Sequence, residues 1–279
     1  MNSFSINRFC KTFRWYFSMS IRSTLAWTGG FTVAVFLAGL IFFVFNPNNL
    51  DDLAQFGVIF IIIGLCAGTC TFISDFNKKT KRVAFLTLPA SNLEKYLSAV
   101  IYTVTVYAFA LFLSVVLGDT LRMVFRSLVY GDEWRSTIPM VINNLSFAFG
   151  SHPYTPELIW FDIMLVIVIV LTILWIHSTY TLGGTLLRKY SFVITSIFWI
   201  TCFILFVKFM SHFQLTMFHT QWNWEHGTPM LESYELGFMS YVVAVALILF
   251  SVFNYWASFH IFKGFQLITN KWTNYDFYK

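Results

Sequence analysis

The sequence predicts an all-α, polytopic integral membrane protein with six transmembrane helices, both termini cytoplasmic, preceded by an amphipathic interfacial helix. Its 279 residues are 57% hydrophobic and only 11% charged, whereas charged residues make up about 25% of a soluble domain. Apolar runs near the 20 residues that a spanning helix needs occur six times. The basic residues gather in alternate connections between these runs, as they do in membrane proteins.

Residues 1–26 precede the first apolar run and have an amphipathic pattern. One side of the expected helix carries Ile6, Phe9, Cys10, Phe13, Phe17 and Ile21, and the other carries Arg8, Lys11, Ser18 and Arg22. Such a helix lies in the membrane interface and holds anionic headgroups. It is also placed to border the docking site of a cytosolic partner.

Residues 27–259 form the predicted six-helix domain, and residues 260–279 form a cytoplasmic tail. The spans are 27–45, 55–74, 97–118, 158–182, 191–210 and 236–259. Runs such as "VIFIIIGLC" do not alternate, so the spans are helices rather than strands of a barrel. The first run ends in "NPNN" without a small-residue cleavage site and is interpreted as a retained span.

Orientation follows from the basic residues, because lysine and arginine are retained on the cytoplasmic side. Fourteen of the 18 lie before the first span, between spans two and three, between spans four and five, or after span six. We therefore expect both termini in the cytoplasm of a multi-pass protein. Because the charges are divided among loops, the net charge of +5 does not indicate nucleic-acid binding.

Two long external loops are expected, at 119–157 and 211–235. In the first, Leu121, Val124, Phe125 and Leu128 have helical spacing before a turn at residues 131–134, and the loop is either a membrane-facing lid or a folded cap. The second is rich in aromatic and acidic residues. Its tryptophans suit the headgroup zone.

The candidate chemistry inside the chain is sparse, and we predict neither an enzyme nor a cofactor or metal site. His212, His219 and His226 are too widely spaced to favour a metal site, and Cys66 with Cys70 adjoins small residues that favour close helix packing. No phosphate loop, nucleophile elbow or zinc helix occurs in the sequence. Asp162 and His177 lie in the fourth span and serve either packing or a transport pathway.

The cytoplasmic loop 75–96 is larger than a connection between helices requires. The second helix is expected to continue through "DFNKKTKRVAFLT" until Pro89 breaks it. Ser91 and Glu94 then have the capping-box spacing that starts a new helix. We expect this corner to expose Phe85, Leu86, Leu88 and Pro89 to the cytosol.

This loop, "FNKKTKRVAFLTLPASNLEKYLS", resembles the first intracellular loop of ATP-binding-cassette (ABC) transporter permeases of the type-2 exporter class. The resemblance implies that the loop couples to a separate ATP-binding ATPase subunit and that two permease subunits, identical or different, form the pathway. The residues implied in coupling are Lys78, Lys79, Lys81, Arg82, Val83, Phe85, Leu86, Leu88, Pro89, Ser91, Glu94 and Lys95.

The expected function is therefore that of a permease subunit of the inner (cytoplasmic) membrane, exporting a substrate while its partner hydrolyses ATP. The basic residues of the loop have a second explanation, because they also enforce orientation and bind lipid headgroups. The alternative function is a non-transporting membrane anchor or assembly protein that binds another partner through the same loop.

Overall fold

Helices dominate the computed structural model, which describes residues 4–45, 50–74, 79–131, 134–146, 156–187, 189–213, 218–225 and 228–264. The first half of the chain contains α1 (Ile6–Phe45), α2 (Leu50–Ser74), α3 (Lys79–Leu86), α4 (Asn92–Tyr102), the π-helix η2 (Thr103–Tyr107) and α5 (Ala108–Tyr130). The second half contains α6 (Ile138–Ser146), α7 (Pro156–Leu186), α8 (Ser191–His212), β1 (Phe218–Glu225), β2 (Thr228–Leu236) and α9 (Phe238–Lys263).

Among the described residues, six helical stretches are long and apolar enough to cross a membrane, which confirms the predicted helical fold with six spans. The cytoplasmic location of both termini stays a prediction. They are Ile6–Phe43, Asp52–Thr71, Asn92–Tyr130, Ile163–Leu186, Ser191–His212 and Phe238–Lys263. The third stretch joins α4, η2 and α5 into one continuous helix. The chain is a multi-pass membrane protein.

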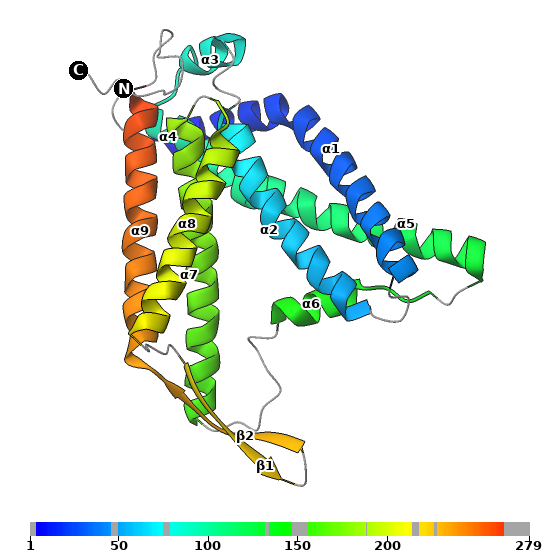
Figure 1. The fold of residues 1–279 in the computed structure, drawn as a ribbon. Helices are drawn as coiled ribbons and strands as arrows, with labels where there is room; N and C mark the ends of the chain where they lie inside the picture. The colour runs from blue at the N-terminus through cyan, green and yellow to red at the C-terminus, as the bar shows by residue number, and fades with distance from the viewer. Residues whose placement is uncertain are drawn as a thin grey trace.

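The long helices form two groups (Figure 1). Helices α7, α8 and α9 stand side by side, while α1, α2 and α5 run obliquely beside them. Helix α2 joins the groups because it packs against both α7 and α5. The start of α1, the helix α3 and the end of α9 lie at one end of the molecule, and the strands lie at the other.

Residues 6–26 are helical as predicted, but they form one helix with the first span rather than a separate element. Their inner face is buried at Thr12, Tyr16, Ser20 and Thr24, which recur every four residues. This face packs against α4, where the hydroxyl oxygens of Thr24 and Tyr102 lie 2.6 Å apart. The interfacial position of this stretch stays a prediction.

A π-helical turn interrupts the third span at Thr103–Tyr107. The Tyr107 ring lies against Gly68 of α2, where any side chain would collide with it. The Tyr107 hydroxyl donates to the carbonyl oxygen of Gly64 at 3.2 Å. Small residues in α2 thus let the third span approach closely, as small residues do in membrane helices.

Part of the predicted external loop 119–157 is a folded cap. Helix α5 continues to Tyr130 and ends at Gly131, whose φ of 69° is the left-handed conformation that glycine adopts easily. The buried carboxylate of Asp119 accepts from the side chain of Arg122 at 2.8 Å and from the backbone N–H of Thr137 at 3.0 Å. These bonds hold the start of α6, which packs on α2.

An antiparallel β-hairpin occupies most of the region predicted as the loop 211–235. Strands β1 and β2 pair from Phe218 with Leu236 to Glu225 with Thr228, with a register shift between Gln221 and Trp222. Two residues separate the strands, the commonest hairpin connection, and one of them is glycine. The hairpin is an addition to the helical fold that was predicted.

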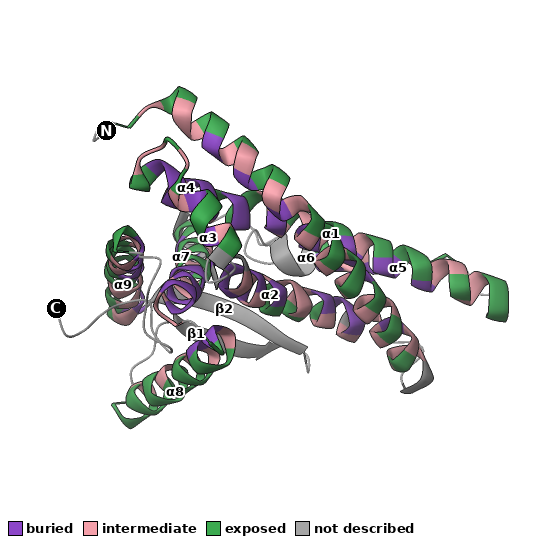
Figure 2. Ribbon diagram, turned by 90° about the horizontal axis from the view of Figure 1, so that it is seen from above, coloured by how far each residue is buried: buried purple, intermediate pink, exposed green. Residues whose placement is uncertain are grey.

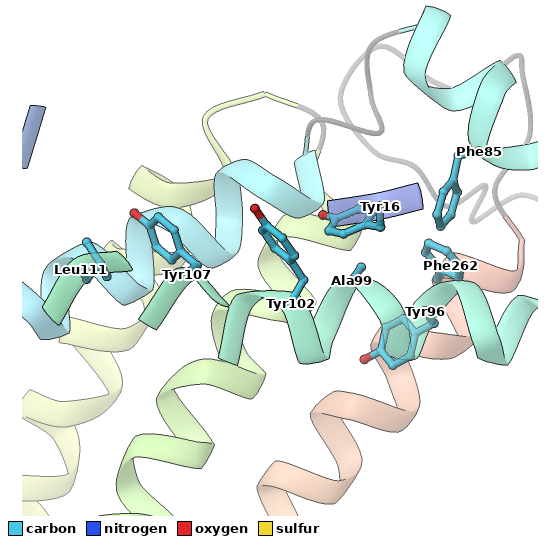
Figure 3. Close-up of a cluster of buried hydrophobic side chains, with 8 residues drawn as sticks. All are labelled: Tyr16, Phe85, Tyr96, Ala99, Tyr102, Tyr107, Leu111 and Phe262. Atoms are coloured by element: carbon cyan, nitrogen blue, oxygen red, sulfur yellow. The ribbon is translucent and has the colours of Figure 1, made fainter. Parts of the chain in front are cut away.

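The largest buried cluster lies near the end of the molecule that carries α3. Tyr16, Phe85, Tyr96, Ala99, Tyr102, Tyr107, Leu111 and Phe262 form it (Figure 3). Exposed residues cover most of α8 instead (Figure 2). This cluster of buried side chains therefore packs around α4 and supports the corner that follows α3.

Candidate functional site

The candidate site is the corner between α3 and α4. Helix α3 ends at Leu86, a turn containing Pro89 follows, and α4 begins at Asn92. The Ser91 hydroxyl accepts the Glu94 backbone N–H at 3.3 Å, and the Ser91 backbone N–H donates to the Glu94 carboxylate at 2.8 Å. The predicted helix, corner and capping box are confirmed, while residues 75–78, through which α2 was expected to continue, lie outside the described residues.

The Glu94 carboxylate also holds the start of α1. Its side chain has an exposed fraction of 0%, and it accepts from Arg8 Nη2 at 3.0 Å and from the Ser5 backbone N–H at 2.7 Å. Hydrogen bonds to a charged group are about twice as strong as neutral ones. One carboxylate therefore caps α4 and ties it to the N-terminal end of α1.

Lys95 closes the corner from the other side. Its ammonium group donates to the carbonyl oxygen of Leu86 at 3.0 Å, at the last residue of α3. The same group lies 5.9 Å from the centre of the Phe85 ring. The last carbonyls of a helix lack partners within the helix and carry partial negative charge, so a lysine satisfies them well. Lys95 thus fixes α3 relative to α4.

Phe85 is buried, which corrects the expectation that it faces the cytosol. Only 2% of its surface is exposed, and its ring points from α3 toward Phe262 of α9, with ring centroids 5.6 Å apart (Figure 3). It also lies 6.1 Å from the Trp15 ring of α1. The buried position of the ring is favoured over an exposed one, because burial removes a large apolar area from water. Phe85 is therefore the internal anchor of α3.

The remaining predicted residues divide by exposure. Arg82 is buried, while Lys81, Leu86, Leu88 and Ser91 are half-buried and Val83 and Pro89 are exposed. Lys78 lies outside the described residues, and Lys79 begins α3 with a side chain that is not described. The exposed residues Val83, Pro89 and Leu93, the last from the start of α4, are together termed the docking face. Val83 and Leu93 are each 40% exposed, although both are apolar.

His177 of α7 lies in a polar network within the membrane domain. Its Nε2 lies 3.1 Å from the Thr103 hydroxyl in η2, and its Nδ1 lies 2.8 Å from the Tyr255 hydroxyl of α9. Asn254 donates to the hydroxyls of Ser178 and Thr179 on the same α7–α9 interface. His177 thus joins three helices, an arrangement that serves packing directly. Asp162 lies in α7, and its side chain is outside the described residues.

The cysteines of α2 take part in packing. Cys66 and Cys70 are both buried beside Tyr180, and Cys70 donates to the Tyr180 carbonyl oxygen at 3.3 Å. Within the described part of the chain, no group of three potential metal ligands comes together. The histidines at 219 and 226 cannot be placed in such a group, because the side chain of His219 and all of His226 lie outside the description.

The ties from Arg8 and Ser5 to Glu94 were not predicted from the sequence. The only signal for them was the capping box itself. The cap uses only part of the hydrogen-bonding capacity of the Glu94 carboxylate, so a buried carboxylate there needs further donors. The cation that takes the rest is 86 residues away in the chain. No protein-family model, curated protein or solved structure matches this sequence.

Proposed function

We propose that this protein is the membrane-spanning permease subunit of an ATP-driven exporter of the type-2 ABC class. A separate ATPase subunit would dock on the docking face of Val83, Pro89 and Leu93. A second permease subunit, identical or different, would complete the pathway in the inner (cytoplasmic) membrane. The resemblance of residues 76–98 to the coupling loop of this class is the starting point.

The observation that supports the proposal most is the bracing of the corner. Glu94 binds Arg8 of α1, Lys95 binds the end of α3, and Phe85 packs on Phe262 of α9. A simple connection between two spans requires none of these contacts. A surface that must transmit force does require them, because a loose loop would absorb the displacement.

The contacts also suggest how force would enter the membrane domain. A displacement of α3 would move α4 through Lys95, and would reach α1 and α9 through the Phe85 ring. ATP binding would bring the two partner ATPases together, and the corners of the two permeases would follow. The spans would then rock between two arrangements, the rigid-body motion that alternating access uses.

In this proposal the permease carries out no covalent chemistry. ATP is bound and hydrolysed by the partner, and the permease converts the motion of that partner into a change of access. The polar interface between α7 and α9, with His177 and Asn254, is suited to packing and would move as part of one group of helices.

Co-purification tests the proposal. We would purify the intact protein from its native membrane and identify the subunits that remain bound to it. The test variant is Val83→Asp with Leu93→Asp, which puts charge on the docking face without touching a residue that braces the corner. The matched control is Leu128→Asp, since Leu128 is an exposed apolar residue at the far end of α5.

The expected result is a Walker-motif ATPase with the wild type and the control, and a reduction of about tenfold or more in its recovery with the test variant. Recovery of an ATPase with all three proteins would place the docking surface elsewhere. Absence of an ATPase from every preparation, with another protein bound through the same face, would instead favour the anchor or assembly function.

A further inference from the structure

A surface groove of about 390 Å³ lies between the N-terminal half of α1 and the short helix α3. Trp15, Ser18 and Met19 line it from α1, and Thr80, Lys81 and Ala84 line it from α3. The volume falls within the range of ligand-binding clefts, which is about 300–1,000 Å³. The docking face of Val83, Pro89 and Leu93 contributes none of these lining residues.

The groove combines an apolar floor with a positive rim. Trp15 and Met19 are half-buried and present an aromatic ring and a thioether. Arg14 and Arg22 lie one turn before and after Ser18 on the same face of α1, and both are exposed. None of the described residues that line the groove is acidic, and the sequence has no aspartate or glutamate before Asp51.

The predicted start of the first span at Trp27 puts the groove near the level expected for lipid headgroups. Met19 precedes the apolar run that begins at Trp27 by about 12 Å of helix, since each residue advances the helix by 1.5 Å. Tryptophan is enriched at this level of a membrane, together with basic residues that attract anionic lipids. A ligand from the bilayer would reach the groove without leaving the interface.

From these observations we infer that the groove binds an anionic phospholipid. The phosphate would lie between Lys81 and Arg14, and the glycerol and upper acyl carbons would lie along Trp15 and Met19. An acidic segment of a partner protein would pair with the basic residues of the rim, but it would leave the apolar side chains of the floor without an apolar partner. This inference stands apart from the proposed transport function and does not require an ATPase partner.

Lipid titration followed by native mass spectrometry tests the inference with the full chain. Purified, delipidated protein in detergent is titrated with palmitoyl-oleoyl phosphatidylglycerol, and in parallel with phosphatidylcholine of the same chains. Saturable binding of the anionic lipid is expected, with much weaker binding of the neutral one. Gel filtration and thermal unfolding of each variant show that it is folded.

Two pairs of variants separate charge from shape. The double variant Arg14→Gln, Lys81→Gln is expected to weaken phosphatidylglycerol binding roughly 30-fold. The control double variant Lys189→Gln, Lys208→Gln removes the same amount of charge elsewhere and should change this binding less than about threefold. Ser18→Trp fills the groove without altering charge and is expected to abolish saturable binding. Cys10→Trp adds the same bulk to exposed surface of α1 outside the groove and is expected to preserve it.

Equal loss of binding with both charge pairs would mean that the lipid responds only to overall charge, and would overturn the inference. Wild-type binding by Ser18→Trp would overturn it as well, because the lipid would then lie elsewhere. If Ser18→Trp instead retained the lipid and lost a co-purifying protein, the groove would be a protein-docking surface.

Discussion

Glu94 and Arg8 form a salt bridge of 3.0 Å across 86 residues of sequence, with the carboxylate fully buried and the arginine side chain 28% exposed. The pair links the first turn of α1 to the first turn of α4. Because Glu94 also caps α4 through Ser91, the same carboxylate takes part in local and long-range structure.

Arg8→Ala should therefore destabilise the protein, because it leaves a buried carboxylate without its cation. We expect a loss of about 1–3 kcal/mol in the free energy of unfolding. Lys11→Ala, which removes an exposed cation from the same helix, should change it by less than about 0.5 kcal/mol. Denaturant-induced unfolding in lipid-free detergent measures both, and equal stability of the two variants would contradict the importance of the bridge.

Lys95→Met should loosen α3 without unfolding the membrane domain. The methionine keeps most of the apolar stem but cannot donate to the Leu86 carbonyl oxygen. Losing a hydrogen bond worth about 1 kcal/mol should speed amide exchange in residues 83–90 about fivefold. Hydrogen exchange followed by mass spectrometry measures this, with Lys189→Met as the control. Unchanged exchange in this segment would show that Lys95 does not hold α3.

Gly68→Ala should destabilise the contact between α2 and the third span. The added methyl group collides with the Tyr107 ring, and overpacking of this kind costs about 1–3 kcal/mol. Gly29→Ala is the matched control, since nothing lies within 4 Å of the position of its added carbon. Alanine there should raise stability slightly through its helix propensity. In thermal unfolding, the midpoint temperature should fall for Gly68→Ala and rise slightly for Gly29→Ala.

His177→Phe and Tyr255→Phe should show energetic coupling in a double-mutant cycle. The two side chains share a hydrogen bond of 2.8 Å, and such bonds between membrane helices average about 0.6 kcal/mol. A coupling near zero would show that the network adds nothing to packing. If His177→Phe abolished transport while the protein kept wild-type stability, His177 would belong to the pathway instead.

Asp119→Ala should release the cap that begins with α6. It leaves the buried Arg122 guanidinium without its carboxylate and removes the acceptor at the start of α6. Breaking a buried pair in this way costs about 3–5 kcal/mol. Faster proteolysis after Arg135 should accompany the loss of stability. Thr120→Ala, an exposed neighbour that bonds only within its own helix, should leave both unchanged.

The spans and the corner were predictable because their signals are local. A run of about 20 apolar residues has few alternatives to a spanning helix, and Ser91 with Glu94 specifies a helix start within four residues of chain. Burial of Phe85 was not predictable, because its neighbours come from α1 and α9, which only the folded chain brings together. An apolar side chain in a basic loop looks exposed until such partners are known.

The two long connections that were predicted to be external show that contacts between distant segments are difficult to predict from the sequence. The helical spacing of Leu121 to Leu128 correctly predicted a helix, but not that it continues the third span to Tyr130. The hairpin of β1 and β2 was missed although its strands are eight and nine residues long. Strand β1 even alternates polar residues with Phe218, Thr220, Trp222 and Trp224, the period of a strand. Its aromatic and acidic residues were interpreted instead as a loop in the headgroup zone. Headgroup binding was predicted for each of the two segments that line the proposed lipid groove, but the groove itself was not, since its two walls belong to helices that are separate in the chain.

The π-helical turn at Thr103–Tyr107 puts the two halves of the third span out of phase. One extra residue in a turn rotates everything after it by about 100° relative to an uninterrupted α-helix. Helix α4 can therefore present Tyr96 to α9 while α5 presents Ser114 to α1 and Asp119 to the start of α6. Deleting a single residue from this turn would restore regular helix, and it would swing α5 away from its partners while leaving the corner between α3 and α4 in place.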